Sequence, residues 1–293
     1  MSTAGFTPFG PFELASVNAG SLLLDGGGMF GVVPKALWEK ASPPDKRNRI
    51  RMQMRSLLIR SRNTDRLYLT DCGAGTKLTP KMAEIYGLDG DRDPLIQSLE
   101  ELGIEPGDIT DLLFTHLHFD HCGGATRYDP SGRLLHNYPN ARYHVHERHL
   151  QTALNPNPRE GASFMKENIE PIVASGQLQK SSDQHIFEPG LSAITVNGHT
   201  AGQQLPHIEA GGQHLLFAAD LIPTVAHLPL PWIMAYDMEP LKTLDEKQRI
   251  LSQVVHEKWF LFMEHDASHE VITVCKRKGK FGIDASIHLS DLG

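Results

Sequence analysis

Residues 115–121 place four side chains of the metal-binding type within six positions, directly after an apolar run. His116 and His118 are two residues apart, so both imidazoles face the same side of an extended chain. Asp120 and His121 follow, and a Cys-Gly-Gly sequence after them lets the backbone bend into a helix. The helical zinc motif has its histidines four residues apart and is therefore different. The spacing predicts a strand that ends in a metal-binding loop, and it restricts the chain to folds that offer one.

Histidine is unusually frequent in this chain, with 16 copies among 293 residues. Seven of them fall in one short segment, at positions 116, 118, 121, 136, 144, 146 and 149. Histidine is the commonest metal ligand and is costly to bury without a partner. The composition alone therefore points towards a metal ion.

Three later segments repeat the pattern of an apolar strand followed by a metal-binding side chain. These are residues 191–196 leading to His199, residues 215–219 leading to Asp220, and residues 259–263 leading to His265. A rigid sheet would hold such side chains in place while the loops beyond shape a pocket. With the first segment they make seven candidate ligands, five histidines and two aspartates. One tetrahedral zinc ion takes four, so two ions are implied, and a carboxylate such as Asp220 can bridge them.

The remaining pattern predicts one αβ domain over residues 1–293, with two sheets inside and helices outside. Strands are expected at residues 21–24, 54–59, 66–70, 109–115, 141–145, 191–196, 213–219, 259–263 and 271–275. Helices are expected at residues 94–102, 147–154, 164–175 and 241–256. The glycines at 26–28 and at 73 and 75 lack the other residues of nucleotide-binding loops, so we interpret both as turns.

Charge and composition exclude several classes of protein. The 28 Lys and Arg against 35 Asp and Glu give a net charge of −7, which disfavours nucleic-acid binding. No stretch approaches the roughly 18 apolar residues of a membrane span, and no signal peptide is visible. Three widely spaced cysteines are typical of a reducing compartment. We therefore expect a cytoplasmic protein with no membrane or nucleic-acid partner.

The His-x-His-x-Asp-His motif, a Gly-His-Thr segment at 198–200, a strand-end Asp and a late His resemble the metallo-β-lactamase-fold hydrolases. The resemblance extends from about residue 22 to residue 265. It implies an α/β fold, a four-layer αβ/βα sandwich of mixed sheets with helices on the outer faces. It also implies two divalent metal ions per chain at one edge of the sheets, with zinc as the expected metal.

The resemblance assigns a role to each candidate ligand. The first ion would be held by His116, His118 and His199, the second by Asp120, His121 and His265, and Asp220 would bridge the two. Asp71 matches a family aspartate that orients a ligand histidine. The alternative for Asp71 is an ordinary aspartate in a turn after a strand.

Residues 24–35 and 227–232 resemble segments of the N-acyl-homoserine lactonases that quench quorum sensing, and of related organophosphate hydrolases. Some lactonases have a tyrosine three residues after the bridging aspartate, where this chain has Pro223. The expected reaction is lactone opening by a hydroxide that bridges two metal ions, with Asp120 as general acid. The alternatives are a promiscuous organophosphate or aryl ester hydrolase, a thioester hydrolase of the glyoxalase type, and a non-catalytic metal-binding protein.

Apolar and aromatic residues near the candidate ligands are candidates for a substrate pocket. They are Met29, Phe30, Phe119, His227, Trp232, Met234 and Tyr236, and each could equally be a core residue. His144, His146 and His149 resemble a second metal site but lack a complete ligand set, so a solvated or structural role is favoured. The expected partner is a small lactone or ester substrate, with a homodimer left open.

Overall fold

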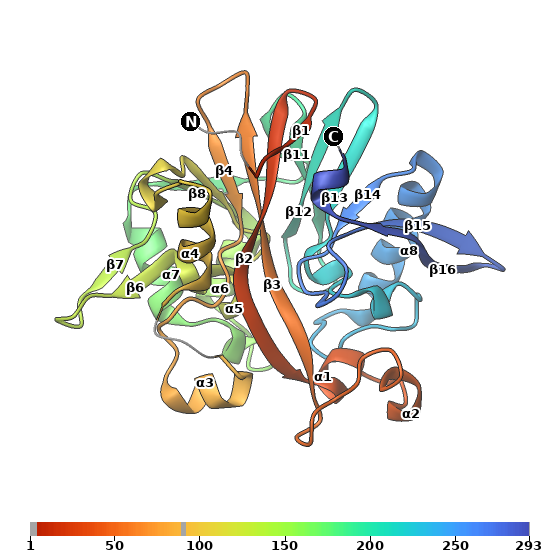
Figure 1. Cartoon of the computed structure of the whole chain (residues 1–293). Coiled ribbons are helices and arrows are strands. Elements are labelled where there is room, and N and C mark those ends of the chain that lie inside the picture. The colour runs from red at the N-terminus through yellow and green to blue at the C-terminus, as the bar shows by residue number, and fades with distance from the viewer. Residues whose placement is uncertain (1–4, 89–91, 293) are drawn as a thin grey trace.

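The computed structural model describes residues 5–88 and 92–292, and two seven-stranded sheets form its centre (Figure 1). The first sheet contains, in spatial order, β1 (Thr7–Phe9), β2 (Phe12–Asp25), β3 (Arg49–Ser61), β4 (Leu67–Thr70), β5 (Asp111–Leu113), β8 (Arg142–His146) and β9 (Leu178–Ser181). The second contains β10 (Ile186–Glu188), β11 (Leu191–Val196), β12 (Gln203–Ala210), β13 (Gln213–Phe217), β14 (Phe260–Phe262), β15 (Val271–Arg277) and β16 (Lys280–Ile287). A small ribbon of β6 (Thr126–Tyr128) and β7 (Leu134–His136) lies apart from them.

Both sheets are mixed. Strands β4, β5, β8 and β9 run parallel to one another, whereas the β1–β2, β2–β3 and β3–β4 pairs are antiparallel. In the second sheet β13 and β14 are parallel and the other pairs are antiparallel. The carboxyl ends of β4, β5, β13 and β14 are therefore the places where long connecting loops leave the sheets.

The continuous apolar run in β3 follows from burial of the first sheet on both faces. Leu57 and Ile59 pack into the core between the two sheets, whereas Leu58 packs into the core beneath the helices. Successive side chains of a strand alternate between faces, so a sheet covered on both sides needs apolar residues at consecutive positions. This burial explains why residues 54–59 lack the alternation of a half-exposed strand.

Helices cover the outer faces of the sheets, as predicted from the sequence (Figure 1). They are α3 (Pro80–Tyr86), α4 (Pro94–Glu101), α6 (Glu147–Leu154) and α7 (Lys166–Ala174) on the first sheet's side, and α8 (Pro240–Glu257) on the second's. Asp93 is the N-cap of α4, because its carboxylate accepts a hydrogen bond from the Leu95 N–H at 3.0 Å. The predicted arrangement of two mixed sheets between outer helices is confirmed.

Several predicted boundaries are wrong for local reasons. Residues 26–28 do not form a turn but begin the short helix α1 (Gly26–Phe30), capped by Asp25 through the Gly28 N–H. β5 ends at Leu113, because residues 114–118 already belong to the loop. β12 was missed because Pro206 lies inside it, and β16 because its residues are mostly polar and partly exposed.

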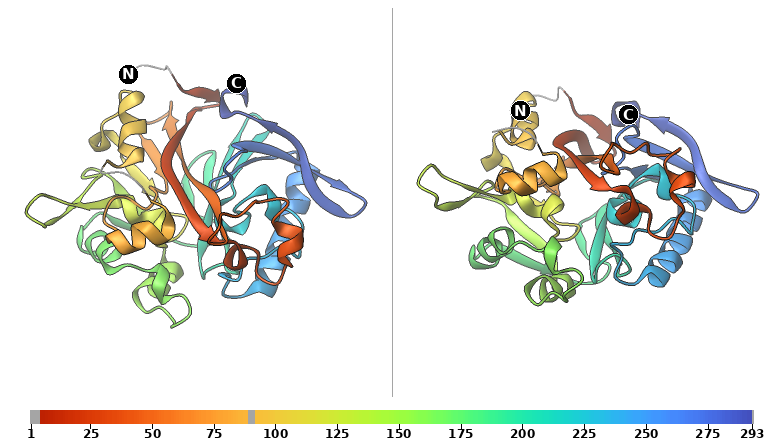
Figure 2. Two further views of the ribbon diagram at one scale, coloured as in Figure 1. Left: turned by 60° about the horizontal axis from the view of Figure 1, so that its bottom comes forward. Right: turned by 90° about the horizontal axis from the view of Figure 1, so that it is seen from below.

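Figure 2 shows α1 and α2 (Lys35–Trp38) at the end of the molecule seen from below.

Within the described ranges, no helix is long and apolar enough to span a membrane.

Candidate metal centre

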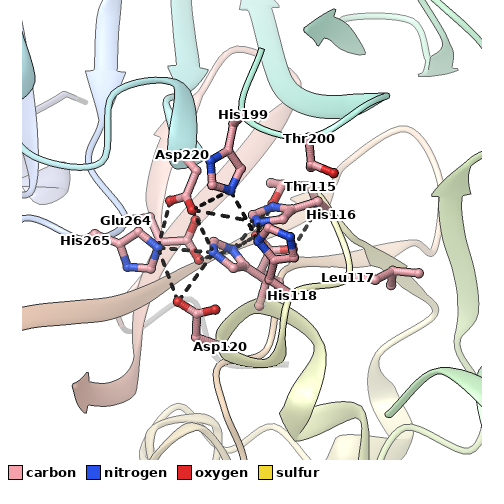
Figure 3. A network of polar contacts seen from close by, with 12 residues as sticks. Thr115, His116, Leu117, His118, Asp120, His199, Thr200, Asp220, Glu264 and His265 are labelled. Carbon is pink, nitrogen blue, oxygen red and sulfur yellow. Dashed lines mark hydrogen bonds and ion pairs between the residues drawn. The ribbon is translucent and has the colours of Figure 1, made fainter. Parts of the chain in front are cut away.

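The loop after β5 carries the first four candidate ligands. Residues 116 and 117 have no regular structure, and α5 (Phe119–Cys122) then begins with His118, whose backbone is extended, as its N-cap residue. His116, His118 and Asp120 point into one region (Figure 3), and the helical turn adds His121, whose Nε2 lies 3.7 Å from Asp120 Oδ2. The change from loop to helical backbone inside the motif therefore brings the four side chains together.

The glycines after the motif are required by a close approach to the loop that follows β4. A Cβ atom on Gly124 would lie 2.1 Å from the carbonyl oxygen of Cys72, and one on Gly123 would lie 2.2 Å from that of Ala74. Both distances are far below normal contact, and neither glycine has a positive φ angle. The Cys72 N–H also donates to the His121 carbonyl at 2.7 Å, which joins the two loops. The glycines thus allow the Asp71 loop to pack against the metal-binding motif.

Four of the predicted ligands converge as one group. His118 Nδ1 lies 3.0 Å from His116 Nε2 and 3.2 Å from His199 Nε2. Asp220 Oδ2 lies 3.1 Å from His199 Nε2 and 3.8 Å from His116 Nε2. All four side chains are buried, and their donor atoms lie within 4.8 Å of one another. They come from both sheets, since His199 follows β11 and Asp220 follows β13.

The other three predicted ligands form a second group beside the first. His265 Nε2 lies 3.2 Å from His121 Nε2 and 4.0 Å from Asp120 Oδ2. His121 Nε2 lies 3.7 Å from Asp120 Oδ2. Asp220 connects the groups, because its Oδ1 lies 3.0 Å from His265 Nε2 while its Oδ2 faces His199. The structure therefore brings together all seven residues. Asp220 lies between His199 and His265 and connects the two groups (Figure 3).

The outward nitrogen of each imidazole faces a hydrogen-bond acceptor. The pairs are His116 Nδ1 with Thr115 Oγ1 (3.0 Å), His118 Nε2 with Glu160 Oε1 (3.4 Å), His121 Nδ1 with Asp71 Oδ2 (3.0 Å), His199 Nδ1 with Asp237 Oδ1 (2.9 Å) and His265 Nδ1 with the Gln53 carbonyl (2.8 Å). An acceptor at one ring nitrogen keeps the proton there and leaves a lone pair on the other. When the five rings are neutral, their lone pairs and the two carboxylates face one another, an arrangement that a bound cation would stabilise. This donor set fits divalent metal ions.

Electrostatics of the metal-free cluster lead to the same conclusion. Burial alone would raise the pKa of Asp220, but His199, His265 and His121 hold it well below its usual value. Burial lowers the pKa of His199, yet Asp220 and Asp237 outweigh it and raise that pKa to about 10. Without a metal, the cluster thus attracts protons to offset its carboxylates. A divalent cation would supply that positive charge in their place.

A cavity of about 340 Å³ opens directly above the cluster. His118, Asp120, His199, Asp220 and His265 form part of its wall. The apolar part of the wall includes Leu24, Met29, Met52, Phe119, Met234 and Met238. The rest of the wall is formed by Tyr86, Tyr236, Arg159, Glu160, Ser163 and Ala235. The cavity is of the size and character that bind small apolar molecules with a polar reacting group.

The seven predicted pocket residues divide into two sets. Met29, Phe119, Met234 and Tyr236 lie on the cavity wall. Phe30, His227 and Trp232 lie outside it, because they pack on one another: the Phe30 ring stacks on His227 at 4.8 Å and meets Trp232 edge-on at 5.7 Å. His227 Nε2 also donates a hydrogen bond to the Met29 carbonyl at 2.8 Å. Phe30, His227 and Trp232 therefore support the cavity wall from outside.

Three buried carboxylates that contact candidate ligands were not predicted. Glu160 reaches His118 from the loop before α7, and Asp237 reaches His199 from the loop before α8. Glu264 Oε1 lies 3.2 Å from His121 Nδ1, the nitrogen that Asp71 also faces. Only Glu264 had a sequence signal, because it directly precedes His265. The other two lie in loops without a motif, and only the fold brings them to the site.

His144, His146 and His149 do not form a metal site. All three are buried, but His144 faces Asp111 at 2.7 Å and His146 faces Asp183 at 3.1 Å. These separate partners point the imidazoles apart. Of the two roles expected for these histidines, burial favours the structural one over the solvated one.

Comparisons with known proteins agree with the fold and the site. Residues 52–256 match the family model of the Metallo-beta-lactamase superfamily. An N-acyl homoserine lactonase of Bacillus thuringiensis is 26% identical over 197 residues, which cover 66% of this chain and 68% of that protein. The structure of a probable metal-dependent hydrolase from Staphylococcus aureus has a TM-score of 0.86 at 28% identity, covering 96% of this chain and 98% of that one. The dizinc quorum-quenching lactonase AidC shares the fold, with a TM-score of 0.76 at 20% identity and coverages of 97% and 98%.

The sandwich, its converging histidines and aspartates, and the family match identify a metal-dependent hydrolase with a divalent metal cofactor. The chain belongs to the metallo-beta-lactamase superfamily, whose family model covers more than half of its length. Membership in a hydrolase family disfavours the alternative of a non-catalytic metal-binding protein.

Proposed function

We propose that this protein is a dizinc hydrolase that opens lactone rings, with N-acyl homoserine lactones as its substrates. The observation that carries the proposal is the cluster of seven donor groups at the base of a largely apolar cavity. A lactone with an acyl chain has the matching form, a polar ester beside an apolar tail. The similarity to N-acyl homoserine lactonases of known sequence supports the same substrate class.

We assign the seven residues to two metal ions as the family resemblance implies. His116, His118 and His199 would hold the first, Asp120, His121 and His265 the second, and Asp220 would give one oxygen to each. Two such ions, when bound, polarise a carbonyl oxygen and make a nucleophile from water at neutral pH. The outward hydrogen bonds of the five imidazoles fix the ring orientations and tautomers that this arrangement needs.

Asp120 is our candidate for the general acid. Hydrolysis joins a hydroxide oxygen to the carbonyl carbon and breaks the ring C–O bond, so the departing oxygen needs one proton. The position of Asp120 supports this role, because the residue lines the cavity and is 7% exposed. Its Oδ2 lies 3.7 Å from His121 Nε2 and 4.0 Å from His265 Nε2, beside the second group of donors.

The cavity wall would hold the acyl chain. Met29, Met52, Met234 and Met238 contribute flexible thioether side chains, which adapt to ligands of different shape. Pro223, at the position of the lactonase tyrosine, is absent from the wall, whereas Tyr86 and Tyr236 provide hydroxyl groups there. A hydroxyl from either tyrosine could take the place of the missing one.

The test compares kcat/KM for N-hexanoyl homoserine lactone and for paraoxon, using zinc-loaded enzyme. We expect ring-opened N-hexanoyl homoserine to form much faster than the background rate. The Asp220→Ala variant, purified in parallel, controls for contaminating lactonases. A lactone rate equal to that of this variant would refute the proposal.

An organophosphate or aryl ester hydrolase is the second candidate. The rings of Tyr86 and Phe119 lie on the cavity wall with their centroids 4.6 Å apart and their planes tilted by 34°, and they offer an aromatic surface to an aryl leaving group. A kcat/KM for paraoxon above that for the lactone would favour this candidate.

Three broader predictions remain to be tested. We propose a single domain over residues 1–293, supported by the core that both sheets share. Sedimentation of the purified protein would test the homodimer, and fractionation of cells would test the cytoplasmic location.

A further inference from the structure

His149 lies at the start of α6 and contacts two loops that carry candidate metal ligands. Its Nε2 accepts a hydrogen bond from the Leu117 N–H at 2.7 Å. Its Nδ1 faces the Ala201 carbonyl at 3.1 Å. Leu117 lies between His116 and His118, and Ala201 lies two residues after His199. One imidazole thus touches the two loops that carry the three histidines of the first group.

The hydrogen-bond partners define the state of this ring. The Leu117 N–H can only donate and the Ala201 carbonyl can only accept, so the proton must lie on Nδ1 and Nε2 must be bare. Burial, with His118 nearby, lowers the pKa of His149 to about 3, which agrees with a neutral ring. Both nitrogens are occupied, so His149 has no lone pair left for a metal ion.

The turn at residues 197–203 also packs tightly against the first turn of α6. A Cβ atom on Gly202 would lie 2.7 Å from His146 Nδ1 and 2.9 Å from the backbone nitrogen of His149. The Asn197 side chain accepts hydrogen bonds from Arg148 and from the Gly202 N–H. The first turn of α6 therefore holds the turn at residues 197–203 in place. A small shift of the α6 start would move His199 with that turn.

We propose that His149 is a positioning residue of the metal site, whose imidazole sets the distance between the loop of His116 and His118 and the turn of His199. His118 Nδ1 and His199 Nε2 are only 3.2 Å apart, although they belong to different halves of the molecule. A backbone bond from the Gln204 N–H to the Thr115 carbonyl at 2.8 Å joins the same halves, and Glu160 connects His118 to Thr200. His149 adds a further link, made to the backbone of both loops. The inference rests on the proposed metal site and does not depend on the substrate.

The test uses zinc affinity, measured by chelator competition on metal-free protein, together with the melting temperature of that protein. His149→Phe fills the space but makes neither hydrogen bond, whereas His149→Gln offers an oxygen to accept and an NH₂ to donate. The matched control is His207→Phe, because His207 is a buried imidazole stacked on Trp259 at 4.4 Å, away from the site. Wild-type protein that binds no zinc would refute the metal site itself, a result separate from the outcomes below.

We expect His149→Phe to weaken zinc binding roughly 10- to 100-fold, as changes around metal ligands do. His149→Gln should stay within about threefold of wild type, on the same reasoning that its hydrogen bonds are kept. The control should bind zinc like wild type even if its melting temperature falls. Unchanged zinc affinity in His149→Phe, or an equal loss in the control, would overturn the proposal. If His149→Phe does not fold, a tenfold or larger loss in His149→Gln would overturn it.

Discussion

Oδ1 of Asp220 lies 3.0 Å from Nε2 of His265, although the two residues follow different strands of the second sheet. The other oxygen of the same carboxylate lies 3.1 Å from His199. One side chain therefore contacts both groups of candidate ligands. Its two oxygens make Asp220 the residue on which a site for two ions depends most.

Asp220→Ala is expected to lose at least one metal ion per chain and nearly all activity. Removing the carboxylate leaves the imidazoles of both groups without their shared negative partner, so the fall in kcat/KM should exceed about 100-fold, the upper range for changes outside the ligand set. Elemental analysis and lactone kinetics measure both effects. Asp284→Ala, at an exposed residue paired with Arg277, is the control. Two bound ions with intact activity would refute the bridging role.

Glu160→Ala should weaken zinc binding roughly 10- to 100-fold, because His118 loses the acceptor that orients its ring. Glu160 is 3% exposed and also accepts a hydrogen bond from Thr200, so its removal affects the loops of both His118 and His199. Chelator competition measures the change. Glu170→Ala, at an exposed position of α7, should behave like wild type. An affinity equal to wild type in Glu160→Ala would contradict the prediction.

Gly124→Ala should destabilise the metal-free protein by about 1–3 kcal/mol, the usual cost of overpacking a tight contact. The added Cβ would lie 2.1 Å from the Cys72 carbonyl oxygen, which is backbone and cannot turn away. Thermal or urea unfolding measures the loss. Gly282→Ala is the matched control, since its Cβ would meet nothing within 4 Å. Equal stability of the two variants would show that the loops separate easily.

Met234→Ala should shift the enzyme towards longer acyl chains, because it enlarges the apolar wall of the cavity. One methylene in an apolar pocket is worth about 1–3 kcal/mol, so the ratio of kcat/KM for ten-carbon over six-carbon acyl chains should rise roughly tenfold. Met82→Ala, in α3 and outside the cavity wall, serves as control. An unchanged ratio would place the acyl chain elsewhere.

Asp111 should contribute stability that is lost in acid. Burial opposes its ionisation, but hydrogen bonds from His144 and Arg142 outweigh burial and lower its pKa from 3.8 to about 2. A carboxylate with a lowered pKa in the folded protein stabilises it above the unfolded pKa, and that contribution disappears as the pH falls from about 4 to about 2. The difference between the folded and the unfolded pKa of Asp111 corresponds to about 2 kcal/mol in the free energy of unfolding.

The check compares wild type with Asp111→Asn by urea unfolding at several pH values. The difference in free energy of unfolding should be largest above pH 5 and should shrink towards pH 2. A difference that does not change with pH would mean that ionisation of Asp111 contributes nothing. Asp284→Asn, at an exposed pair, controls for general effects of charge.

Much of the site could be predicted because its residues follow apolar strands. Residues 191–196 form β11 as predicted, and residues 147–154 form α6 as predicted. His199 and His265 could be chosen because the same strand-then-ligand pattern recurs, and the family resemblance assigned each residue to a group. β16 and β12 were missed, since polar residues or an internal proline hide a strand whose hydrogen bonds come from its neighbours.

The sequence by itself determined the kind of chemistry, because imidazole and carboxylate groups at strand ends carry that information in their identity and spacing. Apart from Asp71, which the family resemblance indicated, only the tertiary structure decided which residues orient those groups. Glu160 and Asp237 contact the ligands from segments with no motif of their own, and the histidine pattern around His149 did not indicate its contact with the ligand loops. The physical reason is that a hydrogen bond to a ligand depends on how distant loops pack, and packing is settled by the two shared cores rather than by any local pattern.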